Sequence, residues 1–319
     1  MPLRPLGVSD FFDATFKTMR RYIAPTLGVG FALALVTAVI SMVAMLVFVD
    51  PGQMRVLNPG NMADPNNPIQ GIEDIVGNGD LTYFMIQMAG ALLLGVTQLL
   101  VSGMVATVAM SATVGEPLTL GQAWARVRPR LVQLLLLTLL TFTVGLLGLM
   151  ISAGIGYATY VAATSIFAGV VVGILALLLT TVISLFLTVR YFALAGPAIV
   201  IERASVGQAL RRAGALSRQQ FSRILGIYLL LSIVIGFGVG LLAMPFSIGA
   251  AAAQTGLGGD TGMILYMILN QLGTLLTTAI SAPLSGLVAC LLYLDQRFRK
   301  EAFDVTLINY VEARRQAAS

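Results

Sequence analysis

The best candidates for chemistry in this chain are uncharged polar side chains within a long apolar segment, residues 263–294. Such groups can hydrogen-bond a ligand or line a pore inside a membrane. The candidates for lining a cavity are Asn270, Gln271, Thr274, Thr277, Thr278 and Ser281. All of these except Gln271 fall close to one face of a helix. The alternative is hydrogen bonding between neighbouring helices, worth about 0.6–2 kcal/mol per pair.

Basic residues form a second candidate group, placed in the segments that separate apolar stretches. At the edge of a membrane, such cations attract anionic lipid headgroups. The residues predicted to contact anionic lipid or a partner protein are Lys17, Arg20, Arg21, Arg126, Arg128, Arg130, Arg211, Arg212, Arg218 and Arg223. Nucleic acid is not an expected partner, because insertion into a membrane explains the basic segments more simply.

The sequence lacks the residues that several classes of chemistry require. The chain has no histidine, and Cys290 is its only cysteine. It shows no nucleophile motif, phosphate-binding loop or dinucleotide fingerprint, and the acids of residues 50–80 do not match the spacing of a calcium-binding EF-hand. We therefore predict no catalytic residue, cofactor or metal site, and a protein that is not an enzyme.

The composition indicates an integral membrane protein. The chain has 319 residues, of which 57% are hydrophobic and only 10% charged. Six apolar segments are long enough to cross a membrane. They span residues 24–49, 81–113, 131–157, 161–189, 224–250 and 263–294. No charge lies inside a span, which disfavours a transporter coupled to protons or sodium. Asp295 stands at a span end, where its side chain is expected to reach the membrane surface.

Residues 131–189 contain no charged side chain, and a single helix of that length would be about 88 Å long. The chain must therefore fold back within this segment. Glycines permit a turn and tyrosines favour the membrane interface, so the turn is predicted at Gly154, Gly156, Tyr157 and Tyr160. The pairs Gly169/Gly173 and Gly236/Gly240 have the spacing that lets helices approach closely, which favours packing within the chain, with dimerisation as the alternative.

The distribution of cations predicts the orientation of the spans. With six spans, 18 of the 19 Lys and Arg residues fall on one side of the membrane, and Arg55 alone falls on the other. Cationic loops remain in the cytoplasm, so both termini are expected there. The excess of Arg over Lys, with abundant Ala, Val, Leu and Gly, is compatible with a bacterial origin, and the expected location is the bacterial plasma membrane.

A local pattern recurs before the first, third and fifth spans, at residues 5–14, 117–126 and 203–212. We interpret it as three repeats, each an amphipathic helix on the cytosolic face followed by a transmembrane hairpin. In the third copy, Ser205 is placed to cap its helix. The predicted repeats are residues 1–113, 114–196 and 197–300, with 301–319 as a cytosolic tail. The alternative is chance similarity among basic connecting segments.

Three segments resemble a known bacterial family. Arg4–Phe16, Tyr191–Arg203 and Leu291–Val305 look like the corresponding parts of the glycerophosphoryl diester phosphodiesterase membrane-domain family. The resemblance covers nearly the whole chain and implies a polytopic membrane domain. It does not imply catalysis, because the phosphodiesterase domain fused to some members uses histidine and metal-binding carboxylates, and this chain has no histidine.

Together these observations predict an all-α membrane protein with six transmembrane helices in three hairpins. The leading functional hypothesis is a non-enzymatic scaffold or accessory factor in envelope or membrane-protein assembly, acting through a basic cytosolic face. The alternative is an uncoupled transporter or lipid-handling protein with a cavity between the hairpins.

Overall fold

The computed structural model describes residues 8–21, 23–48, 81–114, 119–163, 165–257 and 259–301. These residues form helices without any strand, which confirms the predicted all-α class. The long helices are α2 (Ile23–Phe48), α5 (Leu81–Val114), α7 (Leu131–Ala163), α8 (Ile166–Leu187), α11 (Phe221–Gly256) and α12 (Gly259–Glu301). The short ones are α1 (Val8–Arg21), α6 (Leu120–Val127), α9 (Ala195–Ile201) and α10 (Val206–Ser217). A 3₁₀ turn, Arg128–Arg130, joins α6 to α7, and a π-helical turn, Thr188–Phe192, follows α8.

Six helical stretches within the described residues are long and apolar enough to cross a membrane. They are Thr26–Val47, Met85–Ser111, Gly121–Ala163, Phe167–Ile201, Phe221–Gly256 and Thr261–Lys300. Each overlaps one of the six segments predicted from the sequence. The prediction of a multi-pass membrane protein is therefore confirmed at this level.

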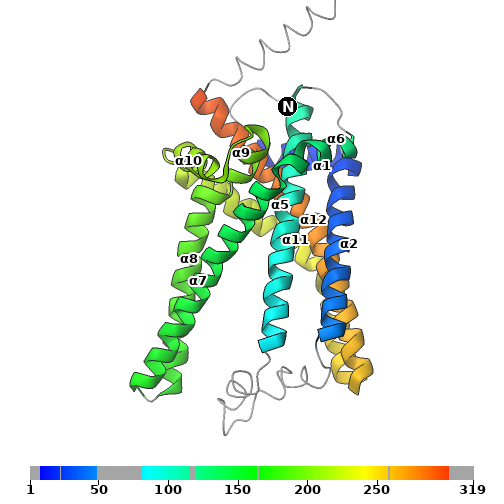
Figure 1. The fold of residues 1–319 in the computed structure, drawn as a ribbon, viewed down its shortest axis with the longest axis vertical. Helices are drawn as coiled ribbons and strands as arrows, with labels where there is room; N and C mark the ends of the chain where they lie inside the picture. The colour runs from blue at the N-terminus through cyan, green and yellow to red at the C-terminus, as the bar shows by residue number, and fades with distance from the viewer. Residues whose placement is uncertain are drawn as a thin grey trace, which may run out of the picture.

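The long helices form two groups that meet at one end of the molecule (Figure 1). In one group, α7 packs along α8; in the other, α2, α5 and α11 each pack against α12. The short helices α1, α6, α9 and α10 gather where the groups meet, at the top of Figure 1. We call this the short-helix end. Toward the opposite end, the α7–α8 pair diverges from α5 and α2.

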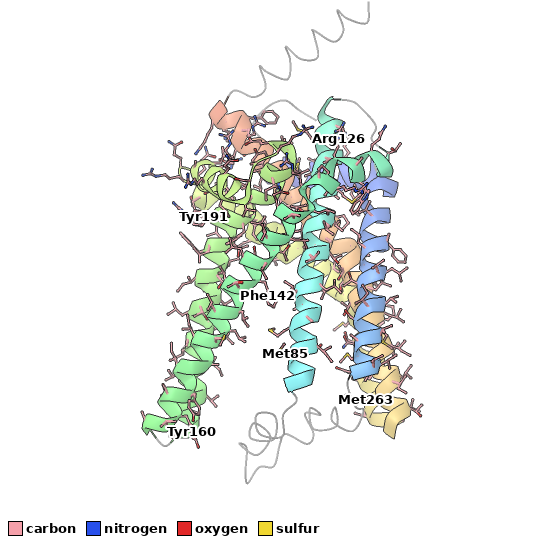
Figure 2. All side chains as sticks on the ribbon, in the orientation of Figure 1. Met85, Arg126, Phe142, Tyr160, Tyr191 and Met263 are labelled. Atoms are coloured by element: carbon pink, nitrogen blue, oxygen red, sulfur yellow. The ribbon has the colours of Figure 1, made fainter. Side chains whose placement is uncertain are left out.

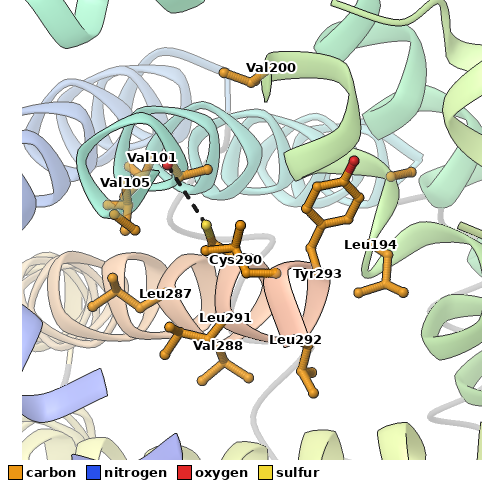
Figure 3. Close-up of a cluster of buried hydrophobic side chains, with 14 of the residues drawn as sticks. Val101, Val105, Leu194, Val200, Leu287, Val288, Cys290, Leu291, Leu292 and Tyr293 are labelled. Atoms are coloured by element: carbon orange, nitrogen blue, oxygen red, sulfur yellow. Dashed lines mark hydrogen bonds between the residues drawn. The ribbon is translucent and has the colours of Figure 1, made fainter. Parts of the chain in front are cut away.

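The second half of α12 is the centre of the hydrophobic core (Figure 3). From Ala282 to Gln296, every residue except Ser285 is buried. This stretch is almost wholly apolar, as expected of a helix that neighbours surround on all sides. Its neighbours are α1, α2, α5, α9, α10 and α11. The Cys290 thiol lies in this core and donates to the Ala106 carbonyl oxygen of α5 at 3.8 Å.

Glycines bring α2 and α5 into direct contact with α12. A Cβ atom on Gly30 of α2 would lie 2.7 Å from the Cγ of Pro283 and 2.7 Å from the Ala279 carbonyl oxygen. A Cβ on Gly286 of α12 would lie 2.7 Å from the Cα of Ser102 in α5. No real Cβ fits at such distances, so both contacts require glycine. The three helices are therefore closely packed in the half nearer the short-helix end.

The predicted turn at Gly154–Tyr160 is wrong. Helix α7 continues through all of these residues to Ala163, and α8 begins at Ile166 after the cap residue Ser165. The glycines serve helix packing instead. A Cβ on Gly156 would lie 3.0 Å from the Cα of Gly173 in α8. A glycine inside an apolar helix marks close approach of another backbone as readily as a turn.

The two pairs with GxxxG spacing differ in their surroundings. Gly169 lies within the α7–α8 contact, where an added Cβ would come within 2.7 Å of the Tyr160 Cβ, and Gly173 faces Gly156. The prediction of packing within the chain is confirmed for this pair. Nothing lies within 4 Å of a Cβ placed on Gly236 or Gly240, so the prediction is wrong for α11.

Two of the short helices begin with the same capping arrangement. The Ser205 hydroxyl accepts from the Gln208 N–H at 3.5 Å, and the Gln208 Oε1 accepts from the Ser205 N–H at 3.0 Å. This confirms Ser205 as the cap of α10. At the start of α6, the Gln122 Oε1 accepts from the Thr119 N–H at 3.1 Å. These reciprocal bonds satisfy backbone groups that a helix start leaves without partners.

Candidate functional site

A cavity of about 870 Å³ lies between α2, α5 and α12, in the half of these helices far from the short-helix end. It lies beyond the contact of Gly30 with Pro283, toward the far ends of the three helices. Met85 and Met263, at the end opposite Arg126, mark this region in Figure 2. All three helices belong to candidate membrane spans, so the cavity lies within the apolar part of the molecule.

Polar residues from all three helices line this cavity. Helix α12 contributes four of the six residues predicted from the sequence, namely Asn270, Gln271, Thr274 and Thr278. The other two, Thr277 and Ser281, are half-buried and are not part of its lining. Helix α2 adds Thr37 and Ser41, and helix α5 adds Gln87.

Sequence reasoning missed Thr37 and Ser41, although a signal for them existed. They stand four residues apart on α2 and therefore share one face of that helix. Gln87 is a polar residue of the predicted span 81–113, but nothing in the sequence relates it to α12. Only the packing of α2 and α5 against α12 brings these side chains to one place.

The polar groups of the cavity differ in which hydrogen bonds they can still form with a ligand. The Thr274 hydroxyl donates to the Asn270 carbonyl oxygen at 3.0 Å, so its oxygen remains an acceptor. The Gln271 Nε2 donates to the Ala38 carbonyl oxygen at 3.3 Å. Among the described residues, no hydrogen bond engages the side-chain amides of Gln87 or Asn270. Both amides can therefore donate to a ligand and accept from it.

Methionines form the apolar part of the same region. Met263 and Met267 of α12 are buried and pack against Met42 and Met45 of α2, together with Ile86 and Tyr266. Met45, Met85 and Met267 line the cavity itself. Methionine is unbranched and flexible, and it adapts to ligands of varying shape.

The cavity contains no charged side chain among its lining residues. Its rim is exposed at Ile40 and Met85, which leave 49% and 60% of their surfaces accessible. A ligand held here would therefore meet uncharged hydrogen-bonding groups on one side and apolar side chains on the other. At the rim the ligand would contact the medium outside the helices.

A cluster of charged residues occupies the short-helix end, where α9 and α10 meet α12. Arg212 of α10 donates to both carboxylate oxygens of Glu202, with its Nη2 at 3.1 Å from Oε1. The Tyr293 hydroxyl of α12 donates to the same Oε1, and the Arg297 Nε lies 3.7 Å away. Glu202 thus joins α10 to α12. Arg203, which follows it, adopts the left-handed conformation at a φ of 55° and ends α9.

The surroundings of Glu202 shift its pKa. Partial burial raises this pKa, but the hydrogen bonds from Tyr293 and Arg212 and the charges of Arg212 and Arg297 outweigh that effect. The pKa of Glu202 is therefore below its ordinary value of 4.5, and the carboxylate remains ionised at neutral pH.

A second acid, Asp295, is fully buried beside this cluster. The Arg299 Nε donates to both of its carboxylate oxygens, the nearer at 3.0 Å, and an Arg223 nitrogen lies 3.9 Å away. The expectation that Asp295 reaches the membrane surface is wrong. A buried carboxylate needs paired charges and hydrogen bonds, and the two arginines supply them.

The basic residues predicted to contact lipid or a partner fall into three groups. Arg212 and Arg223 form ion pairs within the chain and are half-buried. The side chain of Arg21 lies outside the described residues, and Arg130 is half-buried. The exposed ones are Lys17, Arg20, Arg126, Arg128, Arg211 and Arg218. They surround the short-helix end, where Figure 2 labels Arg126.

In the part of the chain that the structure describes, no group of three or more His, Cys, Asp or Glu residues is placed to hold a metal ion. In the comparisons with known proteins, no protein-family model, no curated protein and no solved structure matches the chain. The resemblance to the phosphodiesterase membrane-domain family stays a prediction.

Proposed function

We propose that the protein is a lipid-handling membrane protein, or an uncoupled transporter of amphipathic molecules, that binds its ligand in the cavity between α2, α5 and α12. One observation carries this proposal: Asn270, Thr274 and Gln87, from two helices, converge on a single cavity of about 870 Å³. Cavities of roughly 300–1,000 Å³ with a few convergent polar groups are typical ligand sites. Unlike Gln271, which donates to α2, these three side chains make no hydrogen bond to another helix among the described residues.

The proposed setting is a bacterial plasma membrane with the short-helix end in the cytoplasm. The exposed cations of that end support this orientation, since basic segments remain on the cytosolic side. Three repeats of an amphipathic helix followed by a hairpin remain our interpretation of the chain. The matching starts of α6 and α10, each followed by two long helices, support the second and third repeats.

Gly90 offers a direct test of cavity binding. It lines the cavity, and a Cβ there meets nothing within 4 Å, so a Gly90→Trp side chain can fill the space without a backbone clash. The matched control is Gly145→Trp on α7, where a Cβ also meets nothing within 4 Å and which does not line this cavity. Each variant is purified in lipid nanodiscs and compared by thermal unfolding, to show that it is folded.

The lipids that remain bound after transfer to detergent are then measured by mass spectrometry. We expect Gly90→Trp to lose most of the retained lipid and Gly145→Trp to retain the wild-type amount. Equal lipid retention by all three proteins would argue against ligand binding in the cavity.

The scaffold hypothesis is the second candidate function, and the exposed cations at the short-helix end favour it. Lys17 and Arg20 of α1, and Arg126 of α6, are free of ion pairs within the described residues. Purification in mild detergent should then recover a stoichiometric partner protein that is lost when these three residues are replaced by Ser. Repeated recovery of the protein alone would contradict this second function.

A further inference from the structure

We infer that the cavity selects an uncharged lipid whose polar end carries hydroxyl groups, of the diacylglycerol type, over the anionic phospholipids of the surrounding membrane. This inference rests on the proposed function, because it names the ligand class of the same cavity. Three independent features of the described residues carry it: the absence of charge, the hydrogen-bonding direction of the polar lining, and the methionine wall.

The first feature is electrostatic. The lining residues include Asn270, Thr274 and Gln87 but no Lys or Arg. An ionised phosphate moved into this site would lose its hydration without gaining a countercharge, which is strongly unfavourable in an apolar environment. An uncharged headgroup avoids that penalty.

The cations of the described residues are separated from the cavity. The exposed Lys17, Arg126 and Arg211, for example, belong to α1, α6 and α10 at the short-helix end. Anionic headgroups are therefore attracted to one end of the molecule, while the cavity lies toward the other. The separation lets the two regions bind different lipids.

The second feature is the direction of the hydrogen bonds. The Thr274 hydroxyl proton is directed to the Asn270 carbonyl oxygen, so the Thr274 oxygen can only accept. The amides of Asn270 and Gln87 both donate and accept. A ligand hydroxyl matches this set, because it donates to Thr274 and accepts from an amide. An ionised phosphate oxygen has no proton to donate.

The third feature is the apolar wall. Met45 and Met267 line the cavity beside its polar residues, and Met42 and Met263 pack behind them. Flexible thioether side chains suit acyl chains, whose length and conformation vary. The exposed rim at Ile40 and Met85 gives such chains a way out of the cavity toward the bilayer. The ligand is thus polar at one end, apolar at the other, and uncharged.

The test uses the full-length protein in nanodiscs that contain one of two photoactivatable lipids. One is a diacylglycerol with a diazirine in an acyl chain, and the other is a phosphatidylglycerol with the same chains. After illumination, peptide mapping by mass spectrometry locates the crosslinks. We expect diacylglycerol to label α2, α5 and α12 beside the cavity at least tenfold more than phosphatidylglycerol does.

Variants test whether this labelling depends on the cavity and on the Thr274 hydroxyl oxygen as an acceptor. Gly90→Trp should abolish it, and Gly145→Trp should not. Thr274→Val removes the acceptor oxygen at nearly constant size and should reduce diacylglycerol labelling about fivefold, as expected for one lost hydrogen bond. Its matched control is Thr143→Val on α7. Thr143 also donates to the carbonyl four residues before it, at 2.8 Å, and does not line the cavity.

The outcomes separate this inference from the proposed function. If phosphatidylglycerol labels the cavity as strongly as diacylglycerol, and Gly90→Trp abolishes both signals, the cavity binds lipid and the inferred selectivity is wrong. If neither lipid labels the helices beside the cavity, or labelling is insensitive to Gly90→Trp, both the inference and the proposed function fail. Equal diacylglycerol labelling by Thr274→Val and wild type would also overturn the inferred recognition of a hydroxyl.

Discussion

Ion pairs formed by two acidic residues help hold the short-helix end together. Glu202 receives hydrogen bonds from Arg212 and Tyr293 and lies near Arg297, while Asp295 pairs with other arginines. Glu202, at the end of α9, therefore links α10 to α12, and Asp295 links α12 to Arg223 of α11, in addition to the apolar packing of these helices. Sequence reasoning assigned Arg212 to the surface, because its partner Glu202 lies ten residues away across a turn whose geometry the sequence does not show.

We predict that Glu202→Gln destabilises the protein. The neutral amide accepts hydrogen bonds less strongly and leaves Arg212 and Arg297 without their countercharge. Because the Glu202 side chain is partly exposed, the expected loss is modest, about 1–2 kcal/mol. Thermal unfolding in detergent should show this as a Tm lowered by several degrees. Asp13→Asn, at an exposed acid of α1, is the control and should leave Tm unchanged.

The stabilisation by Glu202 should also depend on pH. Its pKa is lowered in the folded protein, so the folded state binds this proton more weakly than the unfolded chain does. The contribution is therefore complete above the ordinary value of 4.5 and is lost as the pH falls below it. The difference in Tm between wild type and Glu202→Gln should shrink between pH 6 and roughly pH 3.5. A constant difference over this range would contradict the assigned role.

At the scale of elements, glycines determine where helices touch and where they separate. Gly30 lets α2 contact Pro283 of α12, and Gly286 lets α12 contact Ser102 of α5. Beyond these contacts the cavity lies between the same three helices. Gly156 and Gly173 similarly join α7 to α8. Sequence reasoning interpreted Gly156 as part of a turn, because spacing alone does not show whether another backbone lies nearby.

We predict that Gly30→Ala destabilises the packing of α2 on α12. The new Cβ would lie 2.7 Å from both the Pro283 ring and the Ala279 carbonyl oxygen, so the helices must move apart. Such overpacking typically costs about 1–3 kcal/mol. Gly145→Ala, where nothing lies within 4 Å, should instead be neutral or slightly stabilising, because alanine favours the helix. Thermal unfolding of both variants in detergent measures the contrast, and equal Tm values would refute it.

At the scale of the whole molecule, charge and polarity are distributed to opposite ends. Exposed cations gather at the short-helix end, and an uncharged cavity with both polar and apolar lining residues lies toward the other end. The first feature is the pattern that the positive-inside tendency favours, and the space between α2, α5 and α12 forms the second. Under the proposed function, such a protein attracts anionic lipid at one surface and holds a different molecule within the membrane.

We predict that the short-helix end faces the cytoplasm. A reporter fused at Ala125 or Ala215, which belong to α6 and α10, should report a cytoplasmic location. A reporter fused at Leu257, between α11 and α12, should report the opposite side. An outside signal at residue 125 or 215 would refute the orientation, because the exposed cations would then have crossed the membrane.

The sequence by itself determined the helical class, the number of long apolar helices and the polar stripe of α12. These properties depend on composition and on the positions of residues near one another in the chain. Hydropathy measures the first, and helical spacing measures the second. Only the tertiary structure decided that Thr37, Gln87 and Asn270 share a cavity, and that Arg212 is bound to Glu202. Such pairings depend on the angles and close contacts between helices, which residues distant in sequence create together.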